Sequence, residues 1–454
     1  MSSSVLISGA TIADGTSSDI LVVDGLIAKV GKVSDKTDRV IDATGLLALP
    51  GLIDLHTHLR EPGFEQSETV LTGSQAAAKG GFTTVFPMAN TSPVADNASV
   101  VELEQSRGIE AGYVQVQPIG AVTAGLLGTH LADLRGMADS RARVRVFSDD
   151  GKCVHDPLVM RRALEYVLAF DGVIAQHAQE PRLTEQAQMN EGEIASRLGL
   201  AGWPAIAEET IIARDVLIAE SVGAALHVCH LSTAGSVDIV RWAKARGIRV
   251  TAEVTPHHLL LTEDLAVSYD ARYKVNPPLR RQEDVLAVRA GLADGTIDIV
   301  ATDHAPHPSE DKECEWDVAA FGMVGLESAL SIVQQTMVES GQLSWADVVR
   351  VMSSMPARIG RLPWSGLAAG APASITLVDP TARSVFSVDH LAGKSQNSPY
   401  FGRELPGRVV HTMFNGYLTV ENGQLVDAET VASAARLRVA AGLVRGLNEE
   451  RHDG

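Results

Sequence analysis

The sequence has few cysteines, few aromatic residues and no long uninterrupted hydrophobic run. The three cysteines, Cys153, Cys229 and Cys314, are widely spaced and form no Cys-x-x-Cys motif. This pattern argues against a disulfide framework and a thiolate zinc site, and it favours a reducing compartment. No apolar run reaches membrane-spanning length, and the N-terminus lacks a basic region followed by an apolar stretch. We therefore expect a cytoplasmic protein without an export signal.

Positive charge is also scarce. The chain has 38 lysines and arginines against 56 aspartates and glutamates, which gives a formal charge of −18. Such a charge repels nucleic acids and anionic membranes, so we expect neither as a partner. With 45% hydrophobic residues, 4% aromatic residues and 40 glycines, the composition is typical of a turn-rich α/β enzyme with an aliphatic core.

The apolar runs divide the 454 residues into two parts. Short β-rich runs fill 5–41 and indicate a small antiparallel unit. β-type runs return after 366, broken at Asp379-Pro380 and Asn422-Gly423, and a helix is expected over 431–448. Because the first stretch is too short for a stable sheet of its own, we expect 1–50 and 366–454 to form one composite β-sandwich side domain.

Between these segments, apolar strands alternate with helix-length stretches, which is the pattern of parallel βαβ units. Glycines such as Gly112, Gly172 and Gly223 follow helical stretches, where they can end a helix in the left-handed conformation. Eight such units over 51–365 predict an α/β fold with a (β/α)8 TIM-type barrel. The strands are expected at 52–55, 83–86, 114–118, 144–147, 173–176, 225–229, 249–254 and 297–301.

One apolar run, 46–55, ends directly before His56-Thr57-His58-Leu59-Arg60, which places these residues at the C-terminal end of the first barrel strand. Side chains alternate along a strand, so His56, His58 and Arg60 should share one face. Imidazoles are common zinc ligands, and a guanidinium beside them suits a substrate carboxylate. Taken alone, a His-x-His pattern is equally compatible with two polar residues at a strand end.

Polar residues follow other predicted strands in the same way. In chain order they are Asn90, Asp149, Asp150, His177, His230 and Asp303. Catalytic groups of a barrel come from the C-terminal ends of different strands, so these side chains should converge at one mouth. Four histidines and several aspartates at one mouth predict a metal site.

Several motifs carry a family resemblance. Segments 50–58 (PGLIDLHTH) and 302–307 (TDHAPH) resemble the cyclic-amide branch of the amidohydrolase superfamily. Segments 60–63 (REPG), 149–151 (DDG) and 321–327 (FGMVGLE) are similar to those of bacterial type I dihydroorotases, and the resemblance spans essentially the whole chain. It implies zinc-dependent, reversible cyclisation of N-carbamoyl-L-aspartate to L-dihydroorotate in de novo pyrimidine (UMP) biosynthesis.

The resemblance also implies roles for individual residues. One or two zinc ions, two being favoured, would be held by His56, His58, Asp150, His177, His230 and Asp303. Asp303 would also be the catalytic proton carrier. The substrate would be bound by His58, Arg60, Asn90, Asn276, His307, Phe321 and Gly322. The implied partners are a small-molecule substrate and a second copy in a homodimer, and a complex with aspartate transcarbamoylase is left open.

The bridging ligand is where this chain departs from many relatives. Hydantoinases, allantoinases and other dihydroorotases use a carboxylated lysine at the end of the fourth strand, where this chain has Asp149-Asp150-Gly151-Lys152. An aspartate is short and must start closer to the ions than a lysine. We favour Asp150 as the ligand, with Asp149 and Lys152 as alternatives, and a weaker bridge would leave the second ion loosely held.

Two rival functions stay open. An allantoinase or hydantoinase would act on a cyclic amide that lacks the carboxylate suited to Arg60. An inactive homologue could serve as a structural partner of aspartate transcarbamoylase, but it should lack metal ligands, and all six are present. His227, His257 and His258 are assigned no role, and Cys229 is expected to be a buried structural residue.

Overall fold

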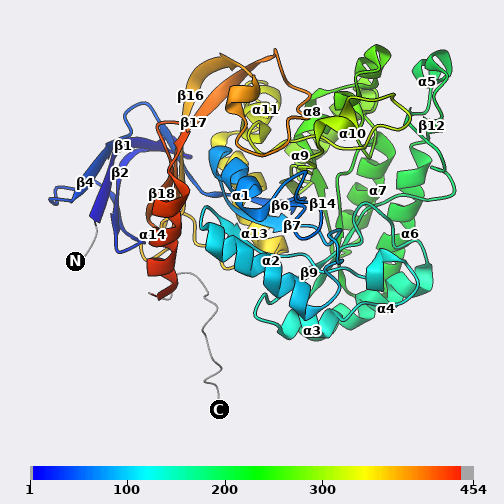
Figure 1. Cartoon of the computed structure of the whole chain (residues 1–454), viewed down its shortest axis with the longest axis horizontal. Coiled ribbons are helices and arrows are strands. Elements are labelled where there is room, and N and C mark those ends of the chain that lie inside the picture. Colours follow the sequence, from blue (N-terminus) through cyan, green and yellow to red (C-terminus); the bar gives the residue numbers. More distant parts are fainter. Residues whose placement is uncertain (1–3, 441–454) are drawn as a thin grey trace.

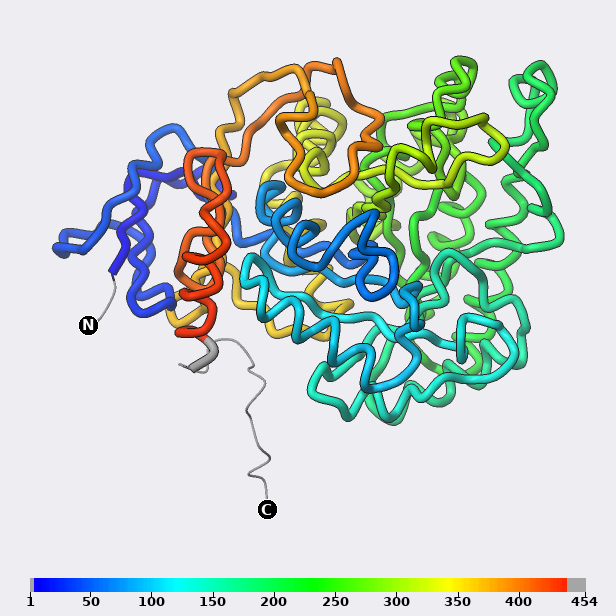
Figure 2. Tube along the Cα trace, viewed as in Figure 1, coloured from blue at the N-terminus to red at the C-terminus, as the bar shows by residue number. Residues whose placement is uncertain are grey.

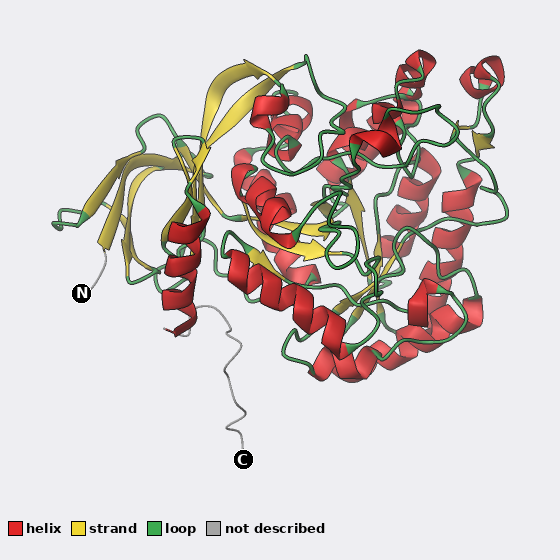
Figure 3. Ribbon diagram, in the orientation of Figure 1, coloured by secondary structure: helices red, strands yellow, loops and turns green. Residues whose placement is uncertain are grey.

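The computed structural model describes residues 4–440, which form a mixed α/β structure (Figure 1). Strands gather at one side and in the interior of the helical part, where helices lie outside them (Figure 3). Eight parallel strands run through the larger part of the chain. They are β6 (Leu52–Thr57), β7 (Phe82–Pro87), β8 (Gln115–Val116), β9 (Val146–Phe147), β10 (Val173–Gln176), β13 (Ala225–Val228), β14 (Val250–Val254) and β15 (Ile299–Val300).

The parallel strands pair in two sheets. Strands β6, β7 and β8 form one sheet, and β9, β10, β13, β14 and β15 form the other. Single parallel bridges join Gly120 to Phe147 and Thr57 to His304, so the two sheets touch at both edges. The prediction of eight parallel strands is confirmed, although β8, β9 and β15 are only two residues long.

Helices or helical turns follow most of these strands. The α-helices are α1 (Val70–Lys79), α2 (Ala98–Ala111), α3 (Leu134–Asp139), α4 (Pro157–Val167), α5 (Glu193–Leu198), α6 (Ile206–Val222), α7 (Ala234–Ala245), α8 (Pro256–Leu260), α9 (Gln282–Asp294), α10 (Ser309–Lys312), α11 (Ala329–Val333), α12 (Trp345–Val349) and α13 (Met355–Ile359). A short parallel pair, β11 (Met189–Asn190) and β12 (Gly202–Trp203), lies between α4 and α6 in the chain.

Helix ends follow from the local sequence. Asn97 and Asp156 accept hydrogen bonds from the first backbone N–H groups of α2 and α4. Gly112 and Gly223 end α2 and α6 in the left-handed conformation, as predicted. After α4, however, Asp171 and not Gly172 takes that conformation.

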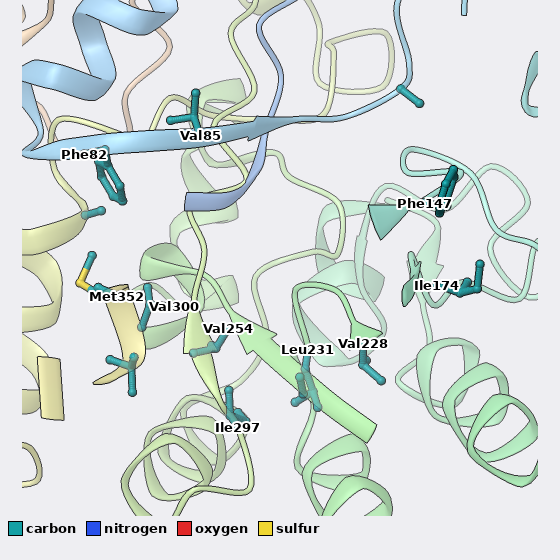
Figure 4. Close-up of a cluster of buried hydrophobic side chains, with 14 of the residues drawn as sticks. Phe82, Val85, Phe147, Ile174, Val228, Leu231, Val254, Ile297, Val300 and Met352 are labelled. Carbon is teal, nitrogen blue, oxygen red and sulfur yellow. The ribbon is translucent and has the colours of Figure 1, made fainter. Parts of the chain in front are cut away.

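The strands bury both of their faces, in two separate clusters. Figure 4 shows the cluster between strands and helices, to which Val85, Phe147 and Val228 belong. The next residue along β7, Phe86, and the residue after β13, Cys229, belong to the other cluster. This alternation of period two is what a strand buried on both sides produces. Cys229 is 1% exposed, which confirms that it is buried.

Strands from both ends of the chain share one nine-stranded sheet, in the order β19-β18-β17-β16-β5-β1-β2-β3, with β4 paired to β1. Its members are β1 (Ser4–Ile12), β2 (Ser17–Val23), β3 (Leu26–Gly31), β4 (Arg39–Asp42), β5 (Leu47–Pro50), β16 (Ile375–Val385), β17 (Glu404–Phe414), β18 (Tyr417–Glu421) and β19 (Gln424–Leu425). The Cα trace in Figure 2 shows this blue, orange and red region beside the helical part.

Three details of this sheet differ from the prediction. The N-terminal strands are not all antiparallel, because β4 and β5 run parallel to β1. The apolar run 46–55 is split at Gly51 into β5 and β6, and a Cβ at Gly51 would lie 2.1 Å from Thr83 Oγ1, so the turn there needs glycine. Strand β16 continues through Asp379-Pro380 with a shift of register. The predicted break at Asn422-Gly423 is found, because the chain turns there between the antiparallel strands β18 and β19.

Helix α14 (Ala428–Ala440) packs against the sheet and ends the described part of the chain. The predicted helix 431–448 is found up to Ala440, and its remainder lies outside the described residues. Within 4–440, no helix is both long and apolar enough to span a membrane.

Glu104 on α2 is a buried carboxyl group with little hydrogen bonding. It is 1% exposed, Thr91 Oγ1 lies 3.4 Å from its Oε1, and its Oε2 has no partner among the described residues. Burial raises the pKa of Glu104 well above its ordinary value.

This pKa predicts a pH-dependent stability. Because the folded-state pKa is raised, the contribution of Glu104 to stability is complete below its unfolded-state pKa and is lost as the pH rises through the folded-state pKa. The substitution Glu104→Gln should therefore gain stability relative to wild type between about pH 5 and about pH 8, by about 1.4 kcal/mol for each unit of pKa difference. Thermal unfolding at both pH values measures this, with Glu110→Gln on the exposed side of α2 as control. An equal difference at the two pH values would contradict it.

Candidate metal centre

The structure brings together six residues that the sequence supplies from five strand ends. All six side chains are buried: His56, His58, Asp150, His177, His230 and Asp303 are each at most 5% exposed. Two groups of their ligand atoms, His56-Asp150-His230 and His56-His58-Asp303, have all members within 4.8 Å of one another.

Asp150 lies at the centre of the four imidazoles. Its Oδ1 is 3.3 Å from His56 Nε2, 3.2 Å from His177 Nδ1 and 3.4 Å from His230 Nε2. Its Oδ2 is 3.4 Å from His58 Nε2. One carboxylate thus reaches ring nitrogens from three different strand ends.

Asp303 closes the other side of the cluster. Its Oδ1 lies 3.0 Å from His58 Nε2 and 3.4 Å from His56 Nε2. Its backbone has φ 47°, in the left-handed region that is unusual for a residue other than glycine, and His230 has φ 30°. Such strained residues persist where the surrounding structure fixes them, often at functional sites.

Asp149 and Lys152 are placed differently from Asp150. Asp149 Oδ1 accepts hydrogen bonds from the backbone N–H groups of Val122 and Thr123, at 2.8 and 2.9 Å, and its Oδ2 accepts one from the Thr123 hydroxyl. Lys152 is exposed. Asp149 therefore joins two loops, and Asp150 alone of the three contacts the histidines.

The electrostatics of the cluster favour a positive charge at its centre. Burial opposes protonation of His56, but Asp150, Glu253 and Asp303 outweigh it and raise the pKa of His56 well above its usual value. Burial also opposes ionisation of Asp303, yet the imidazoles of His56 and His58 hold the pKa of Asp303 at about 2. Asp150 behaves in the same way, and its pKa lies well below the usual value. Both aspartates are ionised at neutral pH.

Arg60 lies beside the cluster, although not for the reason predicted. Strand β6 ends at Thr57, so strand alternation does not extend to Arg60. The backbone of Arg60 has a left-handed φ of 62°. Its Nε donates to the Pro306 carbonyl at 3.3 Å, and its Nη2 lies 3.4 Å from His307 Nε2. Burial lowers the pKa of Arg60 to about 10, which leaves it charged at neutral pH.

Asn90 and Asn276, both predicted to bind substrate, contact the histidines. Asn90 Oδ1 lies 3.0 Å from His58 Nδ1. Asn276 Nδ2 donates to Gln179 Oε1 at 3.1 Å and lies 3.4 Å from His177 Nε2. The Asn276 Oδ1 atom is buried and has no hydrogen-bond partner among the described residues, so it can accept one from a ligand.

The Phe321–Gly322 backbone is already engaged within the protein. The Phe321 carbonyl lies 2.9 Å from His307 Nε2, and the Gly322 N–H donates to the Lys274 carbonyl at 3.0 Å. The Gly322 carbonyl accepts a hydrogen bond from Lys312 Nζ at 2.9 Å. These contacts hold His307 and the 321–322 segment against each other.

Sequence reasoning missed Glu253. It is fully buried on β14, its Oε1 lies 2.6 Å from His56 Nδ1, and it accepts a hydrogen bond from the His230 N–H at 3.1 Å. Its Oε2 lies 3.0 Å from His227 Nε2, and His227 Nδ1 lies 2.9 Å from Thr251 Oγ1. A glutamate inside an apolar strand was the signal that could have indicated this role.

Gln179 and His257 also lie at the site. Gln179 Oε1 is 2.8 Å from His177 Nε2, two residues along the chain. His257 is 2% exposed, its Nε2 has no hydrogen-bond partner among the described residues, and burial lowers its pKa to about 4. Sequence analysis assigned His257 no role, because a histidine at the start of a helix or in a loop is often structural.

The donor atoms fit a divalent metal ion. His56 Nε2 is buried without a hydrogen-bond partner among the described residues, although two carboxylate oxygens lie within 3.4 Å. Imidazole nitrogens and carboxylate oxygens converging in this way form the donor set that zinc and related ions prefer. Cys229 belongs to a third group, with His56 and Glu253, but burial raises the pKa of its thiol and disfavours the thiolate that binds metal.

Known proteins resemble this chain over nearly all of its length. A family model described as Dihydro-orotase-like matches residues 45–236. A protein of Leifsonia xyli subsp. xyli named Dihydroorotase is 69% identical over 93% of this chain and 97% of its own length. One of the same name from Streptomyces coelicolor is 62% identical over 93% of this chain and 100% of its own.

A solved structure has the same fold. The L-hydantoinase (dihydropyrimidinase) of Arthrobacter aurescens superimposes with a TM-score of 0.83 at 26% identity, covering 94% of this chain and 98% of the hydantoinase. The similarity in sequence is much higher to the proteins named Dihydroorotase. These similarities show that the chain belongs to the dihydroorotase family of metal-dependent cyclic amidohydrolases, and the buried histidines and aspartates could hold a metal ion.

Proposed function

We propose that this protein is a zinc-dependent dihydroorotase, which interconverts N-carbamoyl-L-aspartate and L-dihydroorotate in pyrimidine biosynthesis. The observation that supports this most is the contact of Asp150 with ring nitrogens of His56, His58, His177 and His230, in a chain with close relatives named Dihydroorotase. Purified protein should catalyse both directions of the reaction and should lose activity on removal of its metal. Protein that binds zinc but interconverts neither compound would refute the proposal.

We also infer the finer architecture. The bridges from Gly120 to Phe147 and from Thr57 to His304 support closure of the eight strands into a (β/α)8 barrel over 51–365. The shared nine-stranded sheet supports a composite side domain built from 1–50 and 366–454. A barrel places the strand ends that carry the ligands around one mouth.

Two zinc ions fit the arrangement of ligands better than one. His56, His58 and Asp303 would hold one ion, and His177 and His230 the other, with Asp150 between them because its two oxygens face different imidazoles. When bound, the ions would polarise the ring amide carbonyl and lower the pKa of the attacking water. Elemental analysis of the purified enzyme would give the identity and number of the ions.

Glu253 would orient His56 toward this centre. Its carboxylate accepts the Nδ1 proton of His56, which fixes the tautomer that presents Nε2 to Asp150 and Asp303. We expect Glu253→Gln to weaken zinc affinity by about 10- to 100-fold, as measured by competition with a chelator. The exposed Glu220→Gln should leave affinity unchanged. Equal affinity of wild type and Glu253→Gln would contradict this role.

Asp303 would carry the proton. In ring opening, a water oxygen bonds to the amide carbon, the carbon–nitrogen bond breaks, and one proton must pass from the water to the leaving nitrogen. Asp303 is ionised at neutral pH and lies 3.0 Å from His58 Nε2, so it can accept that proton and return it. Ring closure follows the same steps in reverse.

Arg60, Asn276 and His307 would hold the substrate. The Arg60 guanidinium is charged and next to His307, which suits a carboxylate. The partnerless Asn276 Oδ1 can accept a hydrogen bond from a substrate N–H. Asn90, which contacts His58, and Phe321–Gly322, which contact His307 and Lys274, would complete the pocket. A fixed carboxylate places the reacting carbonyl at the ligand cluster.

Two features of assembly stay predictions of the family resemblance. We propose a homodimer, and an active enzyme can also bind aspartate transcarbamoylase. Light scattering of the protein alone and mixed with that partner would measure both.

A further inference from the structure

A cavity of about 420 Å³ lies at the opposite end of the parallel strands from the metal centre. Its walls include Ile53, Thr83 and Gln115, which lie at or next to the first residues of β6, β7 and β8. His56 and His58 follow at the other end of β6. Parallel strands share one direction, so the cavity is separate from the substrate site. Phe414 and Tyr417 of the nine-stranded sheet complete its wall.

The lining of the cavity is rich in arginine, although the protein is strongly acidic. Four arginines line it, Arg141, Arg143, Arg145 and Arg361, and no aspartate or glutamate is among the described residues of its lining. The whole chain has 38 basic side chains against 56 acidic ones, so four arginines at one cavity contrast with the rest of the chain. Arginine is the side chain best suited to bidentate binding of phosphate.

Neighbouring groups hold three of these guanidinium groups in place. Arg141 Nη2 pairs with Glu102 at 3.0 Å, and Arg361 Nε pairs with Asp171 at 2.9 Å. Arg361 also donates to the Asp171 and Arg358 carbonyls, at 3.1 and 3.0 Å. Arg145 Nη1 donates to the Ala138 and Val144 carbonyls, at 2.8 and 2.9 Å.

Arg143 differs from the other three. Like Arg141 it is exposed, but its side chain forms no hydrogen bond or ion pair with another residue in the range 4–440. Arg141, Arg143 and Arg145 all line the cavity, and Arg143 lies in a turn before β9 with a left-handed backbone φ of 48°. Arg143 is therefore the guanidinium whose loss should disturb the protein least and a bound anion most.

The remaining lining of the cavity combines apolar and aromatic side chains with side-chain amides. Val116 and Phe414 are buried in its wall, and Trp364 at its edge is 43% exposed. Gln115 and Asn415 add hydrogen-bonding groups. A volume of this size is within the range of small-molecule sites, about 300–1,000 Å³. Guanidiniums beside an apolar, aromatic wall suit a ligand that combines phosphate with a planar ring.

We propose that this cavity is a binding site for a phosphorylated small molecule with a planar ring, that is, a nucleotide. The phosphate would bind between Arg143 and its neighbours, and the ring would lie against the wall that contains Val116, Phe414 and Trp364. This site is independent of the metal centre, so the proposal does not depend on the catalytic activity.

Calorimetric titration of the zinc-loaded enzyme with magnesium UTP tests the proposal, with uridine and pyrophosphate as the ring-only and phosphate-only probes. We expect UTP to bind more tightly than pyrophosphate, and uridine to bind least. Arg143→Gln should weaken UTP binding by about tenfold, the effect of one lost charge-assisted hydrogen bond. The substitution Arg161→Gln, at an exposed arginine outside the cavity, is the matched control.

Several results would overturn the proposal. They are no UTP binding at millimolar concentration, equal weakening by Arg143→Gln and Arg161→Gln, or displacement of UTP by N-carbamoyl-L-aspartate. Equal affinity for pyrophosphate and UTP would remove the planar ring from the ligand class. Because Arg143 is exposed, the variant should fold. Unchanged dihydroorotase turnover in the absence of UTP would confirm that the substitution affects the cavity and not the catalytic site.

Discussion

Replacing Asp303 by asparagine should lower the turnover of L-dihydroorotate by about 10³- to 10⁴-fold, the range of general acid–base catalysis by one group. The asparagine keeps the size of the side chain and its position near His58, but it cannot accept a proton at neutral pH. We expect the fold and most of the bound metal to be retained, because five other ligands remain. Steady-state kinetics in both directions, with circular dichroism and metal content on the same preparation, measure these quantities.

The substitution Asp303→Ala should give the same loss of turnover. The substitution Asp139→Asn, on the exposed surface of α3, is the control for the change of charge. Activity of either Asp303 variant near that of wild type would remove Asp303 from the mechanism. Loss of all metal would instead show that Asp303 acts mainly as a ligand.

Replacing Arg60 by methionine should lower kcat/KM for L-dihydroorotate by about 10²- to 10⁴-fold, because two charge-assisted hydrogen bonds to the substrate carboxylate are lost. The effect should lie mainly in KM, since the contact is present before the reaction. A substrate panel measures it, and the slow hydrolysis of cyclic amides without a carboxylate, such as hydantoin, should not change.

The same panel separates the rival functions. A hydantoinase or allantoinase would prefer the substrate without the carboxylate, and Arg60→Met would then have little effect on its main activity. The substitution Arg135→Met, at an exposed arginine of α3, controls for the loss of a positive charge. An equal loss on all substrates would show that Arg60 supports the structure of the pocket and does not select the substrate.

Much of the candidate site could be predicted from the sequence, because the residues that meet there follow apolar strands directly. His177 comes immediately after Gln176, the last residue of β10, and His230 lies two residues after the end of β13. Parallel strands bring such ends together whatever the details of the helices between them. The sequence favoured Asp150 over Asp149, and the coordinates show how the two differ: Asp150 contacts the histidines, whereas Asp149 accepts hydrogen bonds from Val122 and Thr123.

Other features depend on backbone detail that a pattern does not contain. Arg60 reaches the site through a left-handed backbone conformation after β6 has ended, and not through strand alternation. The run 46–55 reads as one strand, but Gly51 divides it between two sheets. Glu253 was missed because its partners, His56 and His227, come from other strands, and the pattern within one strand does not show them.

The most direct measurement is anomalous diffraction at the zinc absorption edge from crystals of the zinc-loaded protein. We expect one peak bounded by His56, His58 and Asp303 and a second bounded by His177 and His230, with Asp150 between them. Zinc bound elsewhere, with these six side chains contacting no ion, would contradict this expectation.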